Sequence, residues 1–266
     1  MKARRFFRKL TGRKVVGGLY ELSSPRLQQA VLRAIKSTGR SLTGDHLDVG
    51  SGGGQVLALV ASRYPVSSFA CDYTDQLIET PGQKVDVVDL DEEPLPYPNN
   101  RFALVTCVET LEHLENFRAT VREIYRVLKP GGLAVISTPN ILNLRSRLRY
   151  LTSGFYNLFG PLVPEEPRMQ TTRGHITPIH WFYLAHALLS AGFENLKLSV
   201  DKYQRRSLPA FAILALPLKL MSSFVYRRDA KKHQTLNDTN WWAVRLMSSR
   251  DLLLGRTLIV TATKPL

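Results

Sequence analysis

The stretch 47–54 combines one acid with glycines that alternate with other residues. Asp48 stands two positions before Gly50, and Gly52 and Gly54 follow. Glycine lets the chain turn sharply and lets a ligand approach the backbone, because it has no Cβ in the way. Backbone N–H groups at such turns bind nucleotide ligands. The spacing therefore predicts a nucleotide-type binding loop at residues 47–54.

Two common phosphate-binding forms of this loop do not fit the sequence. The dinucleotide fingerprint needs a glycine or alanine at position 55 or 57, where the chain has Gln55 and Leu57. A P-loop ends in Gly-Lys followed by serine or threonine, whereas Gly54 is followed by Gln55 and Val56. The loop is therefore predicted to bind another kind of nucleoside.

A second acid, Asp72, ends the next apolar run and lies 18 positions beyond Gly54. One carboxylate can accept hydrogen bonds from both hydroxyls of a ribose. Asp72 is therefore a candidate ribose ligand in the same site as Asp48. In the alternative interpretation, Asp48 only caps a strand end and Asp72 is a solvated turn residue.

Acids and an imidazole recur in the run Glu109-x-x-Glu112-His113. If this run forms a helical turn, Glu109 lies beside Glu112 and His113. A histidine titrates near neutral pH and can accept a proton from a substrate hydroxyl. His113, Glu112 and the distant His175 are therefore our catalytic candidates. His180 is a further candidate base, and His186 is expected to pack on a helix face.

The same groups could hold a divalent ion, which would lower the pKa of a substrate hydroxyl. In that case His175 would complete a set begun by Glu112 and His113. In the alternative, Glu112 and His113 cap a helix and shape a pocket. We assign no metal ligands from the sequence, and a divalent metal stays an alternative cofactor.

Short apolar runs separated by helical stretches must position these residues. The helices begin after the Ser24-Pro25 pair, which is typical of a helix start, and recur at about 117–128 and 181–191. Strands are expected at 47–49, 69–71, 85–88, 104–108, 133–136, 196–200 and 257–263. This alternation predicts an α/β fold with a parallel sheet covered on both sides.

Taken together, residues of about 44–140 resemble the class I S-adenosylmethionine-dependent methyltransferases, and closely the group that includes ubiquinone-biosynthesis and lipid or sugar O-methyltransferases. One departure is Ala103, where relatives commonly carry aspartate. The resemblance rests on the order and spacing of the segments 47–54, 71–72, 88–90, 95–97, 101–105, 109–114, 126–132 and 137–140.

The resemblance implies a Rossmann-like fold, with a mostly parallel seven-stranded sheet, helices on both faces and an antiparallel last strand. It also implies S-adenosylmethionine as cofactor. The glycine loop would hold the methionine part, and the second acid would bind the ribose. The end of the third strand would border the adenine, and the end of the fourth strand would form the floor of the site near the sulfonium. The cofactor residues in that order are Asp48, Gly50, Ser51, Gly52 and Gly54; Asp72 and Tyr73; Asp89 and Leu90; Val108 and Glu109.

We divide the chain into a basic N-terminal arm with a leading helix, 1–43, and a methyltransferase domain, 44–266. The domain carries a loop-rich section, 141–180, and an apolar insert, 205–255, before the last strand. Pro217 and Lys219 interrupt the apolar insert, which favours an interfacial or substrate-covering helix over a membrane span.

The formal charge of +14 and pI of about 10.0 imply attraction to phosphates. Residues 1–14 and 208–228 combine basic and apolar side chains, so they are expected to meet an anionic membrane surface. A solvated arm and a buried lid are the alternatives. No RNA-binding module is recognisable, so nucleic acid is not an expected partner.

Two cysteines, Cys71 and Cys107, lie in apolar runs and predict no disulfide or zinc site. Basic residues interrupt the apolar side chains near the N-terminus, so we expect no secretory signal there, although the basic, acid-free character resembles a mitochondrial presequence. We expect a cytoplasmic protein, peripheral on the inner face of the membrane. The expected function is O-methylation of a small-molecule, lipid, or lipid-linked or sugar acceptor, with RNA methylation and a non-catalytic membrane-associated role as alternatives.

Overall fold

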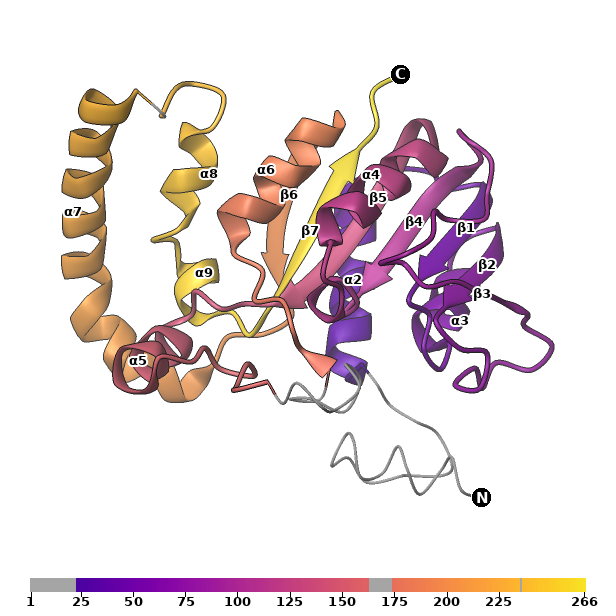
Figure 1. The fold of residues 1–266 in the computed structure, drawn as a ribbon, viewed down its shortest axis with the longest axis horizontal. Coiled ribbons are helices and arrows are strands. Elements are labelled where there is room, and N and C mark those ends of the chain that lie inside the picture. The colour runs from indigo at the N-terminus through magenta and orange to yellow at the C-terminus, as the bar shows by residue number, and fades with distance from the viewer. Residues whose placement is uncertain (1–22, 163–173, 235) are drawn as a thin grey trace.

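A computed structural model describes residues 23–162, 174–234 and 236–266. Its centre is a seven-stranded sheet in the order β3-β2-β1-β4-β5-β7-β6 (Figure 1). All pairs from β3 to β5 are parallel, whereas β7 runs antiparallel to both β5 and β6. The predicted mostly parallel sheet with an antiparallel last strand is confirmed. The strands are β1 (Gly44–Val49), β2 (Val66–Asp72), β3 (Val85–Val87), β4 (Phe102–Val108), β5 (Leu128–Pro139), β6 (Glu194–Val200) and β7 (Thr257–Thr263).

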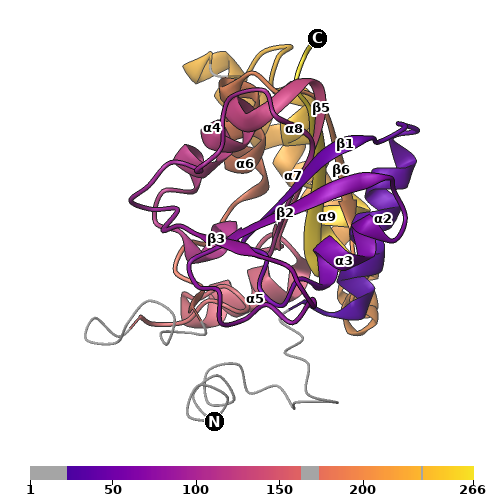
Figure 2. The ribbon, with the colours of Figure 1, turned by 90° about the vertical axis from the view of Figure 1, so that its right-hand side faces the viewer.

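Helices cover both faces of the sheet, as Figure 2 shows. On one face α2 (Pro25–Ser37) and α3 (Gln55–Ala61) pack a hydrophobic cluster that includes Val31, Val60 and Ile259. On the other face α4 (Phe117–Val127) and α6 (Trp181–Ala191) contribute to a larger cluster. Burial on two faces explains why the central strands are apolar along nearly their whole length.

Local signals fix the helix ends that the sequence predicted. Ser24 caps α2 by accepting a hydrogen bond from the backbone N–H of Leu27, and Pro25 occupies the first turn. Asn116 caps α4 in the same way through Ala119. The chain enters β5 at Leu128 directly after α4, so the predicted end of that helix is confirmed to within one residue.

The section predicted to be loop-rich, 141–180, contains a helix, α5 (Leu144–Ser153). The Asn143 side chain caps its start by accepting from Ser146 N–H, and Gly154 ends it with a left-handed φ of 72°. This helix was missed because glycines and prolines follow it closely, whereas its cap is a single asparagine. Part of the section, 163–173, lies outside the described residues.

The apolar insert folds as a 3-10 turn, η3 (Arg205–Ser207), and three helices, α7 (Leu208–His233), α8 (Trp241–Leu246) and α9 (Arg250–Leu254). Figure 1 shows α7 beyond β6 at the margin of the molecule, with α8 and α9 between it and the sheet. Asn140, just after β5, donates to the carbonyls of Leu252 and Gly255, both at 2.9 Å, which fastens the insert to the sheet.

Candidate active site

The polar groups singled out by the sequence gather where the parallel strands end. Asp48 lies near the end of β1, Asp72 ends β2, and Val108 ends β4. Neighbouring parallel strands point the same way, so their carboxyl ends form one edge of the sheet. In open α/β sheets ligands bind at this edge. The site is therefore built from loops that follow β1, β2, β3 and β4.

The glycine loop adopts the backbone that its glycines predict. Gly50, Gly52 and Gly54 have φ angles of 68°, 51° and 79°, in the left-handed region that favours glycine. A Cβ on Gly50 would overlap the side chain of Thr110. The loop thus leaves β1 through a left-handed turn that glycine adopts without strain.

Asp72 is bound to this loop from the next strand. Its Oδ2 accepts a hydrogen bond of 2.8 Å from the backbone N–H of Gly52. Its Oδ1 is buried and has no hydrogen-bond partner among the described residues. Burial raises the pKa of Asp72, while the Gly52 hydrogen bond acts in the opposite direction. One carboxylate oxygen thus orders the loop, and the other is free to accept from a ligand hydroxyl.

Asp48 is buried behind the loop and is held by Thr106 of β4, whose hydroxyl donates to Asp48 Oδ1 at 2.6 Å. Burial raises the pKa of Asp48 to about 7, a net result in which the Thr106 hydrogen bond lowers the pKa and the nearby Asp72 charge raises it. A positively charged ligand beside these two acids would favour their ionised forms. The sulfonium and ammonium groups of S-adenosylmethionine match this requirement.

A buried histidine, His46, contacts the Thr106 hydroxyl that donates to Asp48. His46 Nε2 lies 2.9 Å from the Thr106 hydroxyl, and Nδ1 lies 3.0 Å from the Ser68 hydroxyl. Since Thr106 gives its one proton to Asp48, Nε2 must donate to Thr106 and Nδ1 must accept from Ser68. Burial lowers the pKa of His46 to about 3, so the imidazole is neutral and brings no charge to the site.

The remaining predicted cofactor residues lie around the same edge. Ser51 is buried in the loop, and its hydroxyl has no hydrogen-bond partner among the described residues. Tyr73 follows Asp72 and is 43% exposed, so its ring is accessible to a ligand. Asp89 is exposed and accepts a hydrogen bond from Asp91 N–H at 3.0 Å, which shapes the turn after β3, and Leu90 is half-buried.

The run after β4 forms a 3-10 turn, η1 (Leu111–His113), and Glu109 precedes this turn. Glu109 has a left-handed φ of 53°, and its N–H donates to the Ser137 hydroxyl at 3.1 Å. Glu112 is fully buried, and burial together with the Glu109 charge raises its pKa well above the usual value. Both effects favour the protonated, neutral form of Glu112.

His113 has a defined tautomer because Nδ1 lies 2.7 Å from the Gly174 carbonyl oxygen, which can only accept. The proton is therefore on Nδ1, and Nε2 keeps its lone pair. Burial lowers the pKa of His113, so the ring is neutral at pH 7. This imidazole is prepared to accept a proton.

His175 joins the cluster because its loop is bonded to η1. The N–H groups of Ile176 and Thr177 both donate to the Glu112 carbonyl at 3.0 Å. The rings of His113 and His175 pack edge to face with 4.9 Å between centroids. One ligand atom from each of Glu112, His113 and His175 lies within 4.8 Å of the others. These three donors could also hold a metal ion.

Two other histidines stand apart from this cluster. His180 caps α6 by accepting from Phe182 N–H at 3.1 Å, and burial near Arg147 lowers its pKa to about 4. His186 is exposed on α6 and bonds to Ser190 at 3.3 Å, so the expectation that it packs on a helix face is wrong. His186 lies on the outer side of the amphipathic helix, whereas residues such as Leu184 and Leu188 face the core.

Three polar contacts of the site were missed by sequence reasoning: Thr106, His46 and the Gly174 carbonyl. Each is made across the sheet or between distant loops, and none belongs to a motif. The single signal available was a histidine and a threonine in otherwise apolar strands. Buried polar side chains in a core need partners, which is a reason to examine them.

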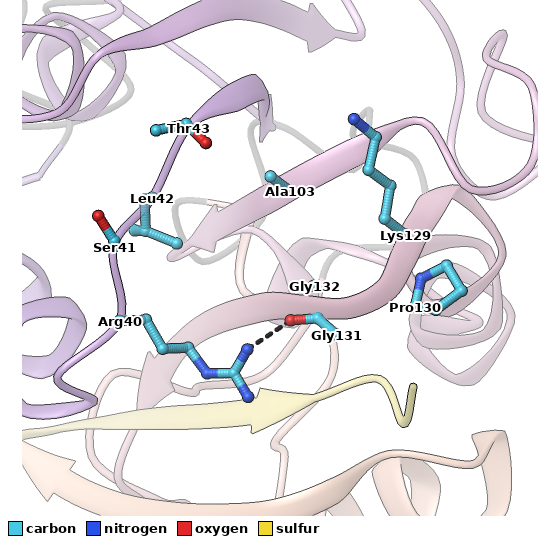
Figure 3. Close-up of a pocket in the computed structure, with 9 residues that line it drawn as sticks. All are labelled: Arg40, Ser41, Leu42, Thr43, Ala103, Lys129, Pro130, Gly131 and Gly132. Atoms are coloured by element: carbon cyan, nitrogen blue, oxygen red, sulfur yellow. Dashed lines mark hydrogen bonds between the residues drawn. The ribbon is translucent and has the colours of Figure 1, made fainter.

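A cavity of about 210 Å³ lies at the opposite edge of the sheet (Figure 3). It is lined by residues 40–43, Ala103 and 129–132, and Arg40 donates across it to the Gly131 carbonyl. These residues precede or begin β1, β4 and β5. The cavity is therefore separate from the carboxyl-end cluster, and none of the residues predicted to be functional lines it.

Comparisons with known proteins agree with this geometry. The methyltransferase domain family matches residues 21–198. A ubiquinone/menaquinone biosynthesis C-methyltransferase, UbiE, from Desulfotalea psychrophila is 30% identical over 118 residues, 41% of this chain and 48% of the relative. A ubiquinone biosynthesis O-methyltransferase from Rickettsia canadensis is 34% identical over 102 residues, 35% of this chain and 42% of the relative. The chain thus spans about half the length of such curated relatives.

A solved structure shares the fold along nearly the whole chain. The SAM-dependent methyltransferase from Archaeoglobus fulgidus superposes with a TM-score of 0.57 at 17% identity, covering 99% of this chain and 100% of that one. The family match covers more than half of this chain, and the mostly parallel seven-stranded sheet with an antiparallel last strand is the predicted architecture. The chain therefore belongs to the methyltransferase domain family.

Proposed function

We propose that the protein transfers the methyl group of S-adenosylmethionine to a hydroxyl oxygen of a small-molecule, lipid, or lipid-linked or sugar acceptor. The observation that carries the proposal is the placement of a neutral His113, with Nε2 unprotonated, at the same sheet edge as the acid-lined glycine loop. A cation-binding loop beside a proton acceptor is what methylation of a hydroxyl requires.

The residues of the first two loops hold the cofactor in this proposal. Asp72 Oδ1 accepts from the ribose hydroxyls, since it is buried without another partner in the described part of the chain. Asp48 and the glycine loop hold the methionine part. Tyr73, Asp89 and Leu90 border the adenine, and Val108 and Glu109 form the floor near the sulfonium.

The cofactor supplies a methyl group already activated by its positive sulfur. The protein must then align the acceptor oxygen opposite that sulfur and remove the hydroxyl proton. His113 Nε2 takes the proton, and the Gly174 carbonyl keeps the other ring nitrogen protonated and the ring oriented. Glu112 and His175 position that ring. The relatives include both a C- and an O-methyltransferase, so the acceptor atom is a proposal that rests on His113.

Calorimetry with S-adenosylmethionine and with its demethylated product tests the cofactor site. Asp72→Asn is expected to weaken binding by about tenfold or more, because it removes the charge that meets the ribose. Asp238→Asn, an exposed aspartate in a distant loop, is the matched control and should bind like the unmodified protein. A folded sample that binds neither ligand would overturn the proposal.

Methylation assays with labelled cofactor on lipid, glycan and RNA extracts identify the acceptor class. Label that enters the lipid or glycan fraction as a base-stable ether would support oxygen as acceptor atom. Label on carbon, or in the RNA fraction alone, would contradict the proposed acceptor while leaving the cofactor site intact.

A further inference from the structure

The helix α7 carries large apolar side chains on the face that points away from the domain. They recur at intervals of three to four residues, which places them on one side of a helix. Each is between 63% and 71% exposed: Ile213, Leu216, Leu220, Met221 and Phe224. We call these five residues the outer stripe. Exposed apolar clusters of this kind mark interaction surfaces rather than ordinary protein surface.

The opposite face of α7 is held against the domain. Phe211, Leu218 and Tyr226 on that face are half-buried, and the Tyr226 hydroxyl lies 3.9 Å from Met247 Sδ. The helix also contacts α9. No residue of α7, described along its whole length, is fully buried. The helix is thus attached along one side, and the outer stripe has no cover within the described parts of the chain.

Basic residues bracket the outer stripe at both ends of the helix. The single acid of α7, Asp229, lies 3.8 Å from Arg228, and one lysine, Lys219, interrupts the apolar centre. An apolar centre between basic ends is complementary to a bilayer that contains acidic lipids, because the apolar side chains can enter the lipid layer while the basic side chains contact the anionic headgroups. The basic residues are Arg205 and Arg206 before the stripe, and Arg227, Arg228, Lys231 and Lys232 after it.

Met247 links α5 to the attached face of α7. Arg147 of α5 donates to the Met247 carbonyl at 2.8 Å. The sulfur of Met247 contacts the hydroxyl of Tyr226 on α7. The outward residues of α5 include Leu148, which is 44% exposed, and Leu151, which is 80% exposed. α5 thus carries further exposed apolar side chains beside a basic residue, and it is connected to α7 through Met247.

The length of α7 would also allow it to cross a bilayer. Arg205–His233 is the one helix of the described residues long and apolar enough to do so, and none of its apolar window is buried. However, a crossing would separate Tyr226 from Met247 and would place Lys219 and the helix-interior Pro217 in hydrocarbon. The attachment of one face favours a helix that lies along the membrane.

From these observations we propose that α7 binds an anionic lipid bilayer, with the outer stripe inserted among the headgroups and the helix axis parallel to the surface. An interfacial helix buries its apolar face by about 5–10 Å, while flanking lysine and arginine side chains meet lipid phosphates. This attachment does not depend on the methyl transfer proposed above.

Sedimentation of the protein with vesicles tests the proposal. Binding is expected with vesicles of phosphatidylglycerol and phosphatidylcholine and much less with phosphatidylcholine alone, and it should weaken as salt rises. Leu220→Asp combined with Phe224→Asp should reduce the partition coefficient about tenfold or more. Tyr183→Asp, which changes an exposed ring on α6, is the control and should bind normally.

A pair of charge-reversal variants tests the role of the basic residues that flank the outer stripe. Arg227→Glu with Arg228→Glu should reduce binding to anionic vesicles by roughly tenfold and flatten its salt dependence. Lys36→Glu with Arg63→Glu makes the same change of charge at exposed positions on α2 and after α3, and should have a smaller effect. Circular dichroism of each variant establishes that a lost interaction is not lost folding.

Several outcomes would overturn the proposal. Equal loss of binding in both charge-reversal pairs would show a general effect of net charge instead of a site on α7. Protein that resists extraction at alkaline pH would show a spanning helix. Absence of vesicle binding, with dimerisation in analytical ultracentrifugation that the Leu220 and Phe224 changes abolish, would assign the outer stripe to a second copy of the chain.

Discussion

The Thr106 hydroxyl on β4 donates a hydrogen bond of 2.6 Å to the Asp48 carboxylate on β1. This bond joins two adjacent strands directly behind the glycine loop. His46 supports it from the other side through its contact with the same hydroxyl. The predicted cofactor site therefore rests on a buried polar chain that crosses the sheet, and the ionisation of Asp48 depends on that chain.

Removing this hydroxyl should weaken cofactor binding. Thr106→Val keeps the shape of the side chain but leaves Asp48 without its donor, so we expect the dissociation constant for S-adenosylmethionine to rise about tenfold. Thr106→Ser should retain most of the affinity. Thr120→Val, at another buried threonine whose hydroxyl makes no hydrogen bond to the described residues, is the control for loss of a buried hydroxyl. Equal affinities in the Thr106→Val and unmodified proteins would contradict the role assigned to this contact.

Cofactor affinity should also rise with pH through neutrality. Burial raises the pKa of Asp48 to about 7. Below pH 7 the Asp48 carboxyl is therefore protonated in most of the ligand-free protein. A cationic ligand favours the ionised carboxylate, so binding must release the proton. We expect roughly tenfold weaker binding at pH 6 than at pH 8. Calorimetry in buffers of different ionisation enthalpy measures the released proton, and Asp48→Asn should abolish that release.

The same pKa has an opposite consequence for the stability of the ligand-free protein. An acid whose pKa is higher in the folded state binds its proton more tightly there than in the unfolded chain. The stabilisation from Asp48 is therefore present at low pH and is lost as pH rises from about 4 to about 7. Bound S-adenosylmethionine should reverse this trend, because it stabilises the ionised form.

The parts of this site that could be predicted are those with a local signature. The alternation of Gly50, Gly52 and Gly54 after an apolar run fixes a strand, a left-handed turn and a helix start within ten residues. Asp72 follows from the same logic one strand later. The Thr106 and His46 contacts could not be predicted, because they depend on which residues become neighbours when β1, β2 and β4 pair.

The fold shows the same division between local and long-range information. The strands and the helices α2, α4 and α6 have clear periodicity and caps, so their positions follow from the sequence. α5 was missed because glycines and prolines follow it closely and a single asparagine marks its start. Its position also depends on a distant contact, the bond from Arg147 to the Met247 carbonyl.

Gly50→Ala should destabilise the protein more than a glycine replacement elsewhere with similar backbone geometry. The residue has a φ of 68°, and its new Cβ would overlap Thr110, whose hydroxyl bonds to the Val49 carbonyl at 3.2 Å. We expect a loss of about 2–4 kcal/mol in the free energy of unfolding by urea. Gly82→Ala has a comparable φ of 73° but no neighbour within 4 Å, so it should cost about 1 kcal/mol. Equal losses would show that strain alone, and not the contact with Thr110, restricts this position.

Replacement of His113 should separate catalysis from cofactor binding. Its Nε2 is the unprotonated nitrogen, because Nδ1 donates to the Gly174 carbonyl at 2.7 Å. With the acceptor fraction identified by labelling, His113→Gln should lower kcat by about a hundredfold or more, since a general base contributes that much. Binding of S-adenosylmethionine, measured by calorimetry, should stay within about twofold, because His113 is not one of the proposed cofactor contacts. His186→Gln, at an exposed position of α6, should leave both quantities unchanged.

A chelator distinguishes this role from metal binding by the same cluster. If His113 accepts the proton directly, activity should persist after treatment with EDTA. Loss of activity that divalent ions restore would instead assign Glu112, His113 and His175 to a metal ion, because one donor atom of each lies within 4.8 Å of the others. His175→Gln sharpens the distinction: a positioning role predicts a partial loss of kcat, whereas a metal ligand predicts a loss that higher ion concentration relieves.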